Sequence, residues 1–473
     1  MNQPVTFVIL AAGLGTRMKS RQAKVLHRAG GRTLLEHVVD TALQLAPPER
    51  VFAVLGHQEE KVRSAVENRG IGFVRQAEQK GTGHAVKVGR DALSHLGGGL
   101  VVLYGDCPLI PATLLEQLID TQMGSGAAAT IVTAIFEDAT GYGRVIRDAH
   151  GNVQAVVEQK AGTPGQLAIR EGNVGIYCFD APLFWEHVDE IQPNNPAREY
   201  YLTDMVEILI RNGRRVQPMT IDDPSDVLGI NDRLELAVAD RILRERKARE
   251  LMLAGVTIEK PETVSIDSAV QIGIDTLVEP FTRILGSTRI GEACRIGACS
   301  IIRESELGDG VVVEPFSIVN TSQVEDGAVV GPYARLRMEN HVEAGAHVGN
   351  FVELKKTRLG RGSKAMHLTY LGDSTVGAKV NVGAGTITCN YDGIKKHPTV
   401  IGDGAFVGSN SILVAPVEVG PGAYTAAGSV ITEGVPPDAL AVGRTRQTVK
   451  PGWAKERRER AKKEKPEASE GTP

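Results

Sequence analysis

The chain has 473 residues, which is too many for a single hydrophobic core and enough for two or three domains. Its 53 Lys and Arg residues against 57 Asp and Glu residues give a formal net charge of −4, which argues against general binding of nucleic acid. The five cysteines are scattered and include no C-x-x-C pair, so we expect a cytoplasmic protein with neither a disulfide framework nor a zinc site.

Residues 1–230 alternate short apolar runs, such as Phe7–Ala11 and Leu100–Tyr104, with helical segments, such as Thr33–Leu45 and Pro111–Met123. This alternation predicts a Rossmann-like α/β domain with a mostly parallel sheet, whose ligands bind at the C-terminal ends of the strands. The first apolar stretch is too short to span a bilayer and lacks the basic leader of a signal peptide, so we expect no membrane insertion.

A glycine-containing loop follows the first predicted strand. Gly13 and Gly15 allow backbone N–H groups to face an anion, and Arg17 and Lys24 add positive charge suited to a polyphosphate. The loop is neither a P-loop nor a complete G-x-G-x-x-G motif, so a plain tight turn is the alternative.

Asp106 closes the predicted strand Leu100–Tyr104. A carboxylate at the end of a strand can bind Mg²⁺ together with nucleotide phosphates. A helix cap or a turn aspartate is the alternative reading of this position.

Residues 231–254 are predicted to link two domains. The segment Asp232–Leu253 is rich in Leu, Ala, Arg and Glu and contains neither Gly nor Pro. It should therefore form one continuous helix that connects the α/β domain to the rest of the chain.

An aliphatic residue returns at every sixth position over much of the C-terminal half, often followed by glycine. Helices repeat at 3.6 residues and half-buried strands at two, so neither explains the pattern. A six-residue repeat is typical of a parallel β-helix, in which each short strand points one aliphatic side chain into the axis. Chance spacing in a series of β-hairpins is the alternative. The longest uninterrupted run is Ile272, Val278, Ile284, Ile290, Ile296 and Ile302.

We expect this β-helix over residues 255–452, with about eighteen residues in each three-sided coil. The basic segment 453–473 is expected to be disordered. Two stretches, Arg361–Leu371 and Cys389–Val400, interrupt the period, and insertions in repeats are commonly loops on the binding face.

The first of these stretches contains His367, a residue type that can take the proton from an amine attacking a thioester. A solvated loop histidine without function is the alternative. Cations near it would suit a sugar phosphate, and amides would suit hydroxyl groups. The polar residues in or beside the interruptions are Arg337, Lys355, Tyr370, Asn381, Asn390 and Tyr391.

Three segments carry a resemblance to a known family. Leu10–Met18 (Leu-Ala-Ala-Gly-Leu-Gly-Thr-Arg-Met), followed by Lys24–His27 (Lys-Val-Leu-His), resembles the signature of sugar-1-phosphate nucleotidyltransferases. Gln76–Ala85 and Thr140–Arg144 are similar to its uridylyltransferase branch. With the hexads, the chain from Val5 to Trp453 resembles the bacterial bifunctional N-acetylglucosamine-1-phosphate uridylyltransferases/glucosamine-1-phosphate N-acetyltransferases.

The resemblance implies an enzyme that acetylates glucosamine-1-phosphate with acetyl-CoA. The same enzyme would then transfer UMP from UTP to the N-acetylated product and release pyrophosphate, with Mg²⁺ as cofactor. Its product, UDP-N-acetylglucosamine, supplies peptidoglycan and lipopolysaccharide synthesis. Members of the family are homotrimers with left-handed β-helices, so we expect small-molecule substrates and copies of the same chain as partners.

The resemblance also assigns roles in the first site. Asp106 and Asn231 would hold Mg²⁺, and Arg17 and Lys24 would bind and neutralise the phosphates. The amino sugar would contact Gly143, Glu158 and Asn173. Together, UTP and UDP-N-acetylglucosamine would contact Leu10, Ala11, Ala12, Gly13, Lys24, Gln76, Gly81, Thr82, Tyr104, Gly105, Asp106, Gly143, Glu158, Asn173 and Asn231.

In the second site, His367 would be the general base. Glucosamine-1-phosphate would contact Arg337, Lys355, Tyr370, Asn381 and Asn390. Acetyl-CoA would contact Ala384, Asn390, Tyr391, Ser409, Ala427 and Arg444.

Three positions depart from the family pattern. Ala23 and Met338 stand where the family usually has proline, and Val174 stands where it usually has threonine. We expect a looser loop at Ala23, a lost sugar contact at Val174 and an altered setting of Arg337 beside Met338. None of the three departures removes a catalytic group.

Two other function classes remain open from the sequence. The first is a nucleotidyltransferase whose β-helix only trimerises or regulates, but such proteins lack the His367 segment and the Cys389–Asp392 insertion. The second is a non-enzymatic scaffold, which would leave Lys24, Asp106 and His367 without a purpose.

Overall fold

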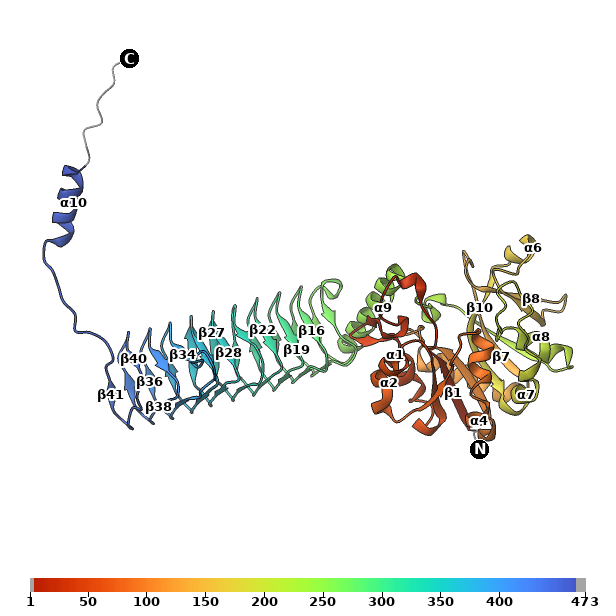
Figure 1. Ribbon diagram of the computed structural model, residues 1–473, viewed down its shortest axis with the longest axis horizontal. Coiled ribbons are helices and arrows are strands. Elements are labelled where there is room, and N and C mark those ends of the chain that lie inside the picture. The colour runs from red at the N-terminus through yellow and green to blue at the C-terminus, as the bar shows by residue number, and fades with distance from the viewer. Residues whose placement is uncertain (1–3, 465–473) are drawn as a thin grey trace, which may run out of the picture. The chain divides into compact units, whose positions relative to one another are not determined.

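The computed structural model describes residues 4–464 (Figure 1). The chain divides into two compact units, residues 1–289 and residues 290–473, here called unit 1 and unit 2. The predicted domain ranges 1–230, 231–254 and 255–452 stay a prediction. Among residues 4–464, every helix is too short or too polar to cross a lipid bilayer.

Unit 1 contains a mixed sheet with the strand order β11-β7-β10-β6-β1-β4-β5, to which β8 and β9 are added beside β10. Strand β1 pairs in parallel with both β4 and β6, whereas β10 runs antiparallel to β6 and β7. The mostly parallel sheet predicted from the sequence is therefore confirmed. The strands are β1 (Val5–Leu10), β4 (Val51–Leu55), β5 (Gly72–Arg75), β6 (Gly99–Tyr104), β7 (Ala129–Ile135), β8 (Gly143–Arg147), β9 (Val153–Val157), β10 (Glu171–Asp180) and β11 (Val216–Ile221), with a separate hairpin of β2 (Arg28–Ala29) and β3 (Arg32–Thr33).

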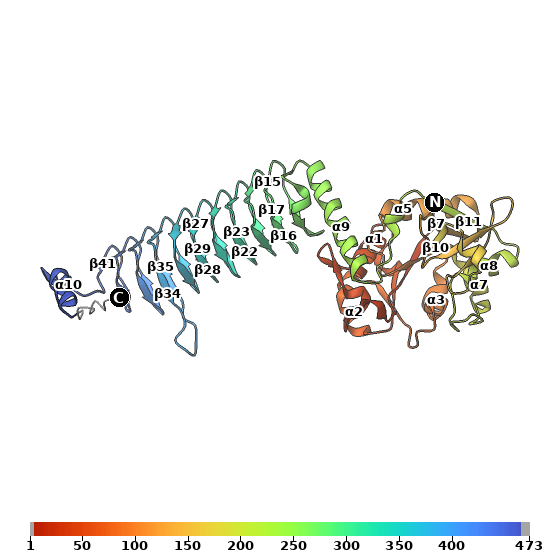
Figure 2. The ribbon, with the colours of Figure 1, turned by 90° about the horizontal axis from the view of Figure 1, so that it is seen from above.

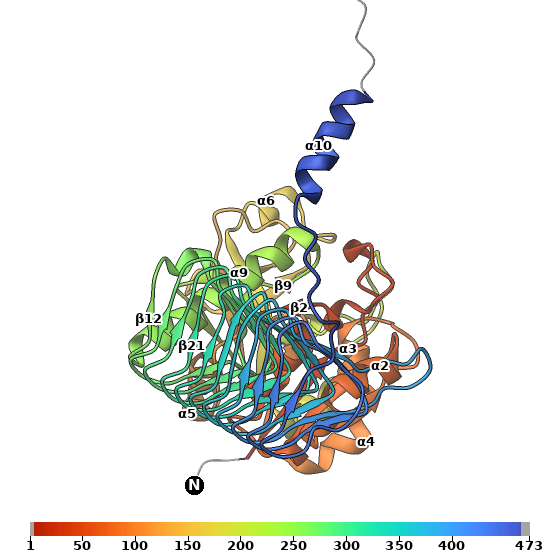
Figure 3. The same ribbon diagram turned by 90° about the vertical axis from the view of Figure 1, so that its left-hand side faces the viewer.

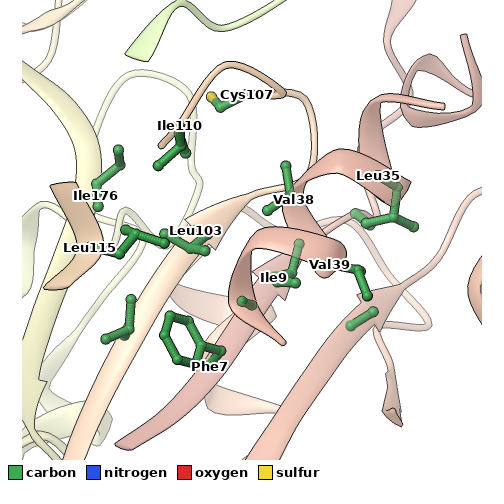
Figure 4. Packing of buried hydrophobic residues seen from close by; sticks show 14 of the residues in the cluster. Phe7, Ile9, Leu35, Val38, Val39, Leu103, Cys107, Ile110, Leu115 and Ile176 are labelled. Atoms are coloured by element: carbon green, nitrogen blue, oxygen red, sulfur yellow. The ribbon is translucent and has the colours of Figure 1, made fainter. Parts of the chain in front are cut away.

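Both faces of this sheet are covered, and every residue of β1 is buried. Phe7 and Ile9 point into the cluster shown in Figure 4, with Leu35 and Leu103. Val8 points into a second cluster on the other face. The helices of unit 1 are α1 (Leu34–Ala42), α2 (Glu59–Val66), α3 (Thr82–Lys87), α4 (Arg90–Leu93), α5 (Ala112–Ser125), α6 (Pro164–Leu167), α7 (Ala181–His187), α8 (Asp204–Arg211) and α9 (Arg233–Leu253).

Helix α9 confirms the predicted continuous helix. Asp232 caps it by accepting hydrogen bonds from the backbone N–H groups of Leu234 and Glu235 at 2.8 and 3.0 Å. Asp240 on α9 accepts a hydrogen bond from Gly30 N at 2.8 Å and pairs with Arg244, which also pairs with Asp267 at 2.7 Å. Helix α9 is thus tied to other parts of unit 1 along its length. After it come β12 (Thr257–Ile258), β13 (Ser265–Ile266), β14 (Gln271–Ile272), β15 (Leu277–Val278), β16 (Arg283–Leu285) and, at the division, β17 (Arg289–Ile290).

Most of unit 2 is made of very short parallel strands arranged in three sheets, each named here after its first strand within this unit. The β18 sheet contains β18 (Arg295–Ile296), β21 (Val312–Val313), β24 (Val329–Val330), β27 (His347–Asn350), β30 (Lys364–His367), β33 (Asn381–Val382), β36 (Phe406–Val407), β39 (Tyr424–Thr425) and β41 (Leu440–Ala441). The β19 sheet contains β19 (Ile301–Arg303), β22 (Ile318–Asn320), β25 (Arg335–Leu336), β28 (Glu353–Lys355), β31 (Tyr370–Gly372), β34 (Ile387–Cys389), β37 (Ile412–Val414) and β40 (Val430–Ile431). The β20 sheet contains β20 (Glu306–Leu307), β23 (Ser322–Val324), β26 (Asn340–Val342), β29 (Arg358–Leu359), β32 (Ser374–Val376), β35 (Thr399–Ile401) and β38 (Val417–Val419).

The chain visits the three sheets in turn, as expected for a β-helix, and Figure 3 shows the coils stacked behind one another. One side chain of each strand points into the axis. Ile302, Leu336, Leu354 and Leu413 are examples, each with no exposed surface. The predicted fold class, an α/β nucleotidyltransferase domain followed by a parallel β-helix of hexapeptide repeats, is confirmed.

Most coils contain seventeen or eighteen residues, since Arg295 pairs with Val312 and Val329 with His347. The coil with the inserted loop contains 25, from Asn381 to its partner Phe406, and the last coil contains 16, from Tyr424 to Leu440. The predicted insertion Cys389–Val400 is confirmed as a loop that projects from the column in Figure 2. The predicted interruption at Arg361–Leu371 is wrong. Ala365 fills the axial position there with no exposed surface, so the coil is regular and only the large aliphatic residue is missing.

The expectation of disorder from residue 453 is also wrong in part. Helix α10 (Trp453–Lys463) has no buried residue, so it is held by local interactions. Its residues are mostly strong helix formers, and the Arg457 guanidinium lies 5.4 Å from the Trp453 ring centroid. The rest of the tail expected to be disordered, residues 465–473, lies outside the described residues.

The axial packing predicts that substitutions of two neighbouring residues on β35 differ greatly in their effect on stability. Ile401 is 1% exposed and points inward, whereas Val400 is 39% exposed. Ile401→Ala should lower the free energy of unfolding of unit 2 by about 2–5 kcal/mol because it leaves a cavity. Val400→Ala, the control, should cost less than about 1 kcal/mol. Urea unfolding of the full chain tests this, and equal midpoints for the two variants would contradict the axial assignment.

Candidate active sites

Unit 1 has a cavity of about 520 Å³ beyond the C-terminal ends of β1 and β6. All predicted residues of the first site line it except Gly105, whose N–H donates to Leu10 O at 2.9 Å behind the cavity wall. The structure therefore brings this predicted set together. Lining residues to which the sequence analysis assigned no role include Leu14, Gln79, Tyr142, Tyr177 and Glu199.

The loop after β1 owes its shape to Gly15. This residue has a φ of 61°, and a Cβ added to it would lie 2.5 Å from the Lys24 Cβ. A larger residue would thus push Lys24 away from the cavity. Gly13 differs, because a Cβ there would meet no atom within 4 Å, so its side of the loop is open to a ligand.

Lys24, Asp106 and Asn231 form the polar centre of the cavity. The Lys24 ammonium makes an ion pair with the Asp106 carboxylate and donates a hydrogen bond to Asn231 Oδ1 at 3.3 Å. Arg17 donates to the same Asn231 oxygen at 2.7 Å. Ile230 N donates to Asp106 O at 3.0 Å, which holds the Asn231 segment beside the end of β6.

This centre has the ligand chemistry of a hard-metal site. Oxygen atoms of Asp106 and Asn231 already converge on one cation, the Lys24 ammonium. Carboxylate and amide oxygens are the ligands that Mg²⁺ accepts, with substrate phosphates completing the set. Among the described residues no group of three or more His, Cys, Asp or Glu side chains could hold a metal ion.

Glu158 and Asn173 also line the cavity. Glu158 accepts a hydrogen bond from Thr203 Oγ1 at 3.0 Å, and burial raises the pKa of its carboxyl. Asn173 donates to Tyr177 Oη at 2.6 Å. Nearby, burial and the charge of Glu158 raise the pKa of Asp204 to about 6.

Two of the three departures from the family pattern can be examined in unit 1. Ala23 is 1% exposed, and its N–H donates to Gln58 Oε1 at 3.3 Å, a bond that proline could not make. Its loop is therefore tied to the segment before α2 rather than loosened. Val174 lines the cavity with an apolar side chain, as expected for a lost polar sugar contact.

In unit 2, Arg337 and Lys355 are register partners on neighbouring coils of the β19 sheet. Lys355 is 7% exposed, and its ammonium lies 3.7 Å from Asp373, which also accepts a hydrogen bond from Asn390 Nδ2. A Cβ added to Gly372 would lie 2.4 Å from Tyr370 Oη and 2.7 Å from Asn390 Nδ2, so these groups meet above Gly372. Arg337, Lys355, Tyr370 and Asn390 are thus gathered on one face.

The register also shows how Arg337 is set beside Met338, the third departure from the family pattern. The Arg337 N–H donates to Leu354 O at 3.0 Å, within the regular ladder between coils. Its guanidinium lies 3.2 Å from Glu353. Met338 is exposed, so the missing proline leaves the backbone of Arg337 in its ladder.

His367 ends β30 at a corner of the coil and is exposed, rather than lying in an inserted loop. The register continues from this corner through Ala384, Ser409 and Ala427, each on the next coil. Neighbouring strands lie about 4.8 Å apart, so the four residues form a column roughly 15 Å long. The predicted base and three predicted acetyl-CoA contacts therefore share one edge, here called the His367 corner.

The remaining predicted residues lie around this edge. Arg444 follows the last strand, and its Cδ would lie 3.7 Å from a Cβ added to Gly428. Asn381 is the register partner of Lys364 on β30, three residues before His367. Tyr391 lies in the projecting loop, 60% exposed, and donates to Gly393 O at 2.6 Å.

Asp373 and Glu353 are site residues that sequence reasoning missed. Asp373 contacts both Lys355 and Asn390, and Glu353 contacts Arg337. Outward positions of a β-helix carry no period, so only the coil register could have placed these carboxylates beside the cations.

Comparison with known proteins agrees with this division into two parts. Residues 7–170 match the family model of the MobA-like NTP transferase domain, and residues 398–433 match that of the bacterial transferase hexapeptide. The chain is 65% identical to a protein named "Bifunctional protein GlmU" from Solibacter usitatus, over 98% of this chain and 99% of that one. It is 50% identical to the protein of the same name from Koribacter versatilis, over 98% and 99% of the two chains. The protein of that name from Anaeromyxobacter sp. is 48% identical, over 97% and 94%.

The position of Lys24 predicts that it competes with a divalent metal. Lys24→Met should increase the affinity of the nucleotide-free protein for Mn²⁺ by about tenfold or more, because a charged hydrogen bond to Asp106 no longer has to break. Isothermal titration calorimetry measures this affinity. Lys19→Met, which removes an exposed lysine of the same loop, is the control. Equal Mn²⁺ affinities for both variants would rule out competition by Lys24.

The pKa of Asp204 predicts a pH-dependent stability. Because the pKa in the fold, about 6, lies above the ordinary value of 3.8, the fold favours the protonated carboxyl. That stabilisation is present at low pH and is lost as pH rises through about 6. Asp204→Asn should therefore raise Tm relative to the unchanged protein more at pH 8 than at pH 5. The same difference at both pH values, as expected for exposed Asp120→Asn, would contradict the assignment.

Proposed function

The chain belongs to the family of the bifunctional GlmU proteins, and from this membership we propose that it catalyses two consecutive steps of UDP-N-acetylglucosamine synthesis. Unit 2 acetylates glucosamine-1-phosphate with acetyl-CoA. Unit 1 then transfers UMP from UTP to N-acetylglucosamine-1-phosphate and releases pyrophosphate. The observation that supports the proposal best is the gathering of each predicted residue set in a single unit, around Asp106 and around His367.

Uridylyl transfer needs positioning and charge neutralisation more than covalent help. The phosphate oxygen of N-acetylglucosamine-1-phosphate attacks the α-phosphorus of UTP, and the bond to the β-phosphate oxygen breaks. Arg17 and Lys24 neutralise the phosphates. Asp106 and Asn231 would hold Mg²⁺, which supplies further positive charge when bound. Glu158 and Asn173 hold the sugar.

Acetyl transfer uses the His367 corner. The amine of glucosamine-1-phosphate attacks the thioester carbon, the imidazole takes the proton from the nitrogen, and the C–S bond breaks to release CoA. Arg337 and Lys355 hold the sugar phosphate, while Tyr370, Asn381 and Asn390 hold the hydroxyl groups. Acetyl-CoA extends along Ala384, Ser409 and Ala427 toward Arg444, with Asn390 and Tyr391 beside it.

The protein acts as a cytoplasmic homotrimer. One edge of a β-helix is an open surface, and a pocket for two substrates needs further walls. Neighbouring copies related by threefold symmetry would supply those walls at the His367 corner. All five cysteines are free, which suits a reducing compartment.

Two single substitutions test the division of chemistry. His367→Ala should lower acetyl transfer by about 10²–10⁴-fold, the usual effect of losing a general base, and leave uridylyl transfer unchanged. Asp106→Ala should reduce uridylyl transfer and leave acetyl transfer unchanged, because it removes a metal ligand. Each activity is assayed separately, by CoA release and by pyrophosphate release.

Matched controls are His347→Ala, on the neighbouring coil of the same sheet, and Asp120→Ala, on the exposed side of α5. Both controls should retain both activities. Near-normal acetyl transfer by His367→Ala would exclude His367 as the base. Loss of both activities from either site variant, in a folded protein, would contradict the division between the units.

A further inference from the structure

Unit 2 has a second cavity, of about 240 Å³, on the outer face of the β19 sheet. Its polar lining residues are Arg303, Asn320, Arg335 and Arg337. Arg303 pairs in register with Asn320, and Asn320 precedes Arg337 by one coil in the same column. Arg335 stands in the adjacent column, next to Ile318.

The register fixes the direction of these side chains. Ile302, Val319 and Leu336 alternate with them and point into the axis with no exposed surface, so the lining side chains face outward. Neighbouring strands lie about 4.8 Å apart, so the backbones of Arg303 and Arg337 are roughly 10 Å apart. Three guanidinium groups therefore stand over one short stretch of sheet.

These cations exceed the carboxylates that contact them. Arg337 lies 3.2 Å and Arg335 3.8 Å from the same carboxylate, that of Glu353. Arg303 has no ion pair among residues 4–464. The Asn320 amide donates to Arg337 O at 2.8 Å, which holds it within the cavity lining.

Solvated surface arginines are the ordinary explanation for such a group. Two features favour a binding site instead. The arginines line a concave surface whose other lining residues include Ile301 and Ile318, and apolar walls strengthen electrostatic attraction. Guanidinium groups match phosphate geometry with paired N–H donors, and the excess positive charge suits a multiply charged oxyanion.

We propose that this cavity binds a phosphate or diphosphate group, and that its occupant competes with glucosamine-1-phosphate by engaging Arg337. The competition rests on the proposed function, in which Arg337 holds the sugar phosphate. Binding of the anion itself rests only on the cavity. One reaction product of unit 1, pyrophosphate, has the required chemistry, and so does the diphosphate of a nucleotide sugar.

The test is inhibition of acetyl transfer by pyrophosphate. Initial rates of CoA release are measured on the full chain without UTP or Mg²⁺, while glucosamine-1-phosphate is varied. Pyrophosphate should raise KM and leave kcat unchanged. Arg303→Ala and Arg335→Ala should each raise the inhibition constant by about tenfold or more, since each removes a charged hydrogen bond. Arg358→Ala, which removes the same charge from the β20 sheet, should behave as the unchanged protein.

Parallel measurements with inorganic phosphate and UDP-N-acetylglucosamine distinguish the sources of the group. Inhibition by phosphate that depends on Arg303 would show that one phosphate group is sufficient. Inhibition confined to UDP-N-acetylglucosamine, and lost in Arg303→Ala, would identify a nucleotide sugar as the occupant. Absence of inhibition by all three compounds, or inhibition constants unchanged in Arg303→Ala and Arg335→Ala, would overturn the proposal.

Failure of the proposed function would give a different result from failure of anion binding at this cavity. If the unchanged protein had no acetyl transfer, the kinetic assay would have no signal, but calorimetric binding of pyrophosphate would still report on the cavity. Asp106→Ala with and without Arg303→Ala is the pair to compare, since Asp106→Ala perturbs the unit 1 cavity equally in both. Equal heats and affinities for these two proteins would exclude the unit 2 site.

Discussion

An inward side chain, which is aliphatic on most of the short strands, determines the arrangement of unit 2. Leu336, Leu354 and Leu413 fill the axis, so the residues beside them must face outward at the spacing of neighbouring strands. Residues one coil apart, which are mostly seventeen or eighteen positions apart and 25 positions apart across the inserted loop, therefore become neighbours in a column. This is why His367 and Ala427, sixty positions apart in the sequence, belong to one edge of the coil. Arg337 and Lys355 meet on the adjoining face for the same reason.

Unit 1 also brings distant site residues together, but through a different arrangement of strands and loops. Its strands place their C-terminal ends together, and the loops that follow carry the charged side chains. Lys24 and Asp106 arrive from different loops, and Asn231 comes from the segment just before α9. The Lys24 ammonium contacts the oxygen atoms that a metal would use, so the Asp106 carboxylate has a cationic partner in this structure. Binding of nucleotide and metal would then be coupled, because the phosphates offer Lys24 a new partner as the metal takes its place.

Much of this architecture could be predicted because its cause is periodic. The hexads predicted the β-helix, and the alternation of apolar runs and helices predicted the parallel sheet. The six-residue period led to the wrong prediction of an interruption at Arg361–Leu371, because Ala365 fills the axis there without being a large aliphatic residue. Helix α10 was missed because nothing packs against it, so only local propensity favours it. Asp373 could not be predicted, since outward polar positions follow no rule until the register is known. The roles of the site residues came from resemblance to a family, whereas spacing alone left Lys24 and His367 undecided.

The central claim is that one chain carries two consecutive reactions. Mass spectrometry of the products formed from glucosamine-1-phosphate, acetyl-CoA, UTP and Mg²⁺, with each component omitted in turn, tests it most directly. The complete mixture should yield UDP-N-acetylglucosamine. N-acetylglucosamine-1-phosphate should accumulate when UTP or Mg²⁺ is omitted, and neither product should form without acetyl-CoA. Failure of N-acetylglucosamine-1-phosphate to accumulate without UTP, or formation of UDP-N-acetylglucosamine without acetyl-CoA, would contradict the account.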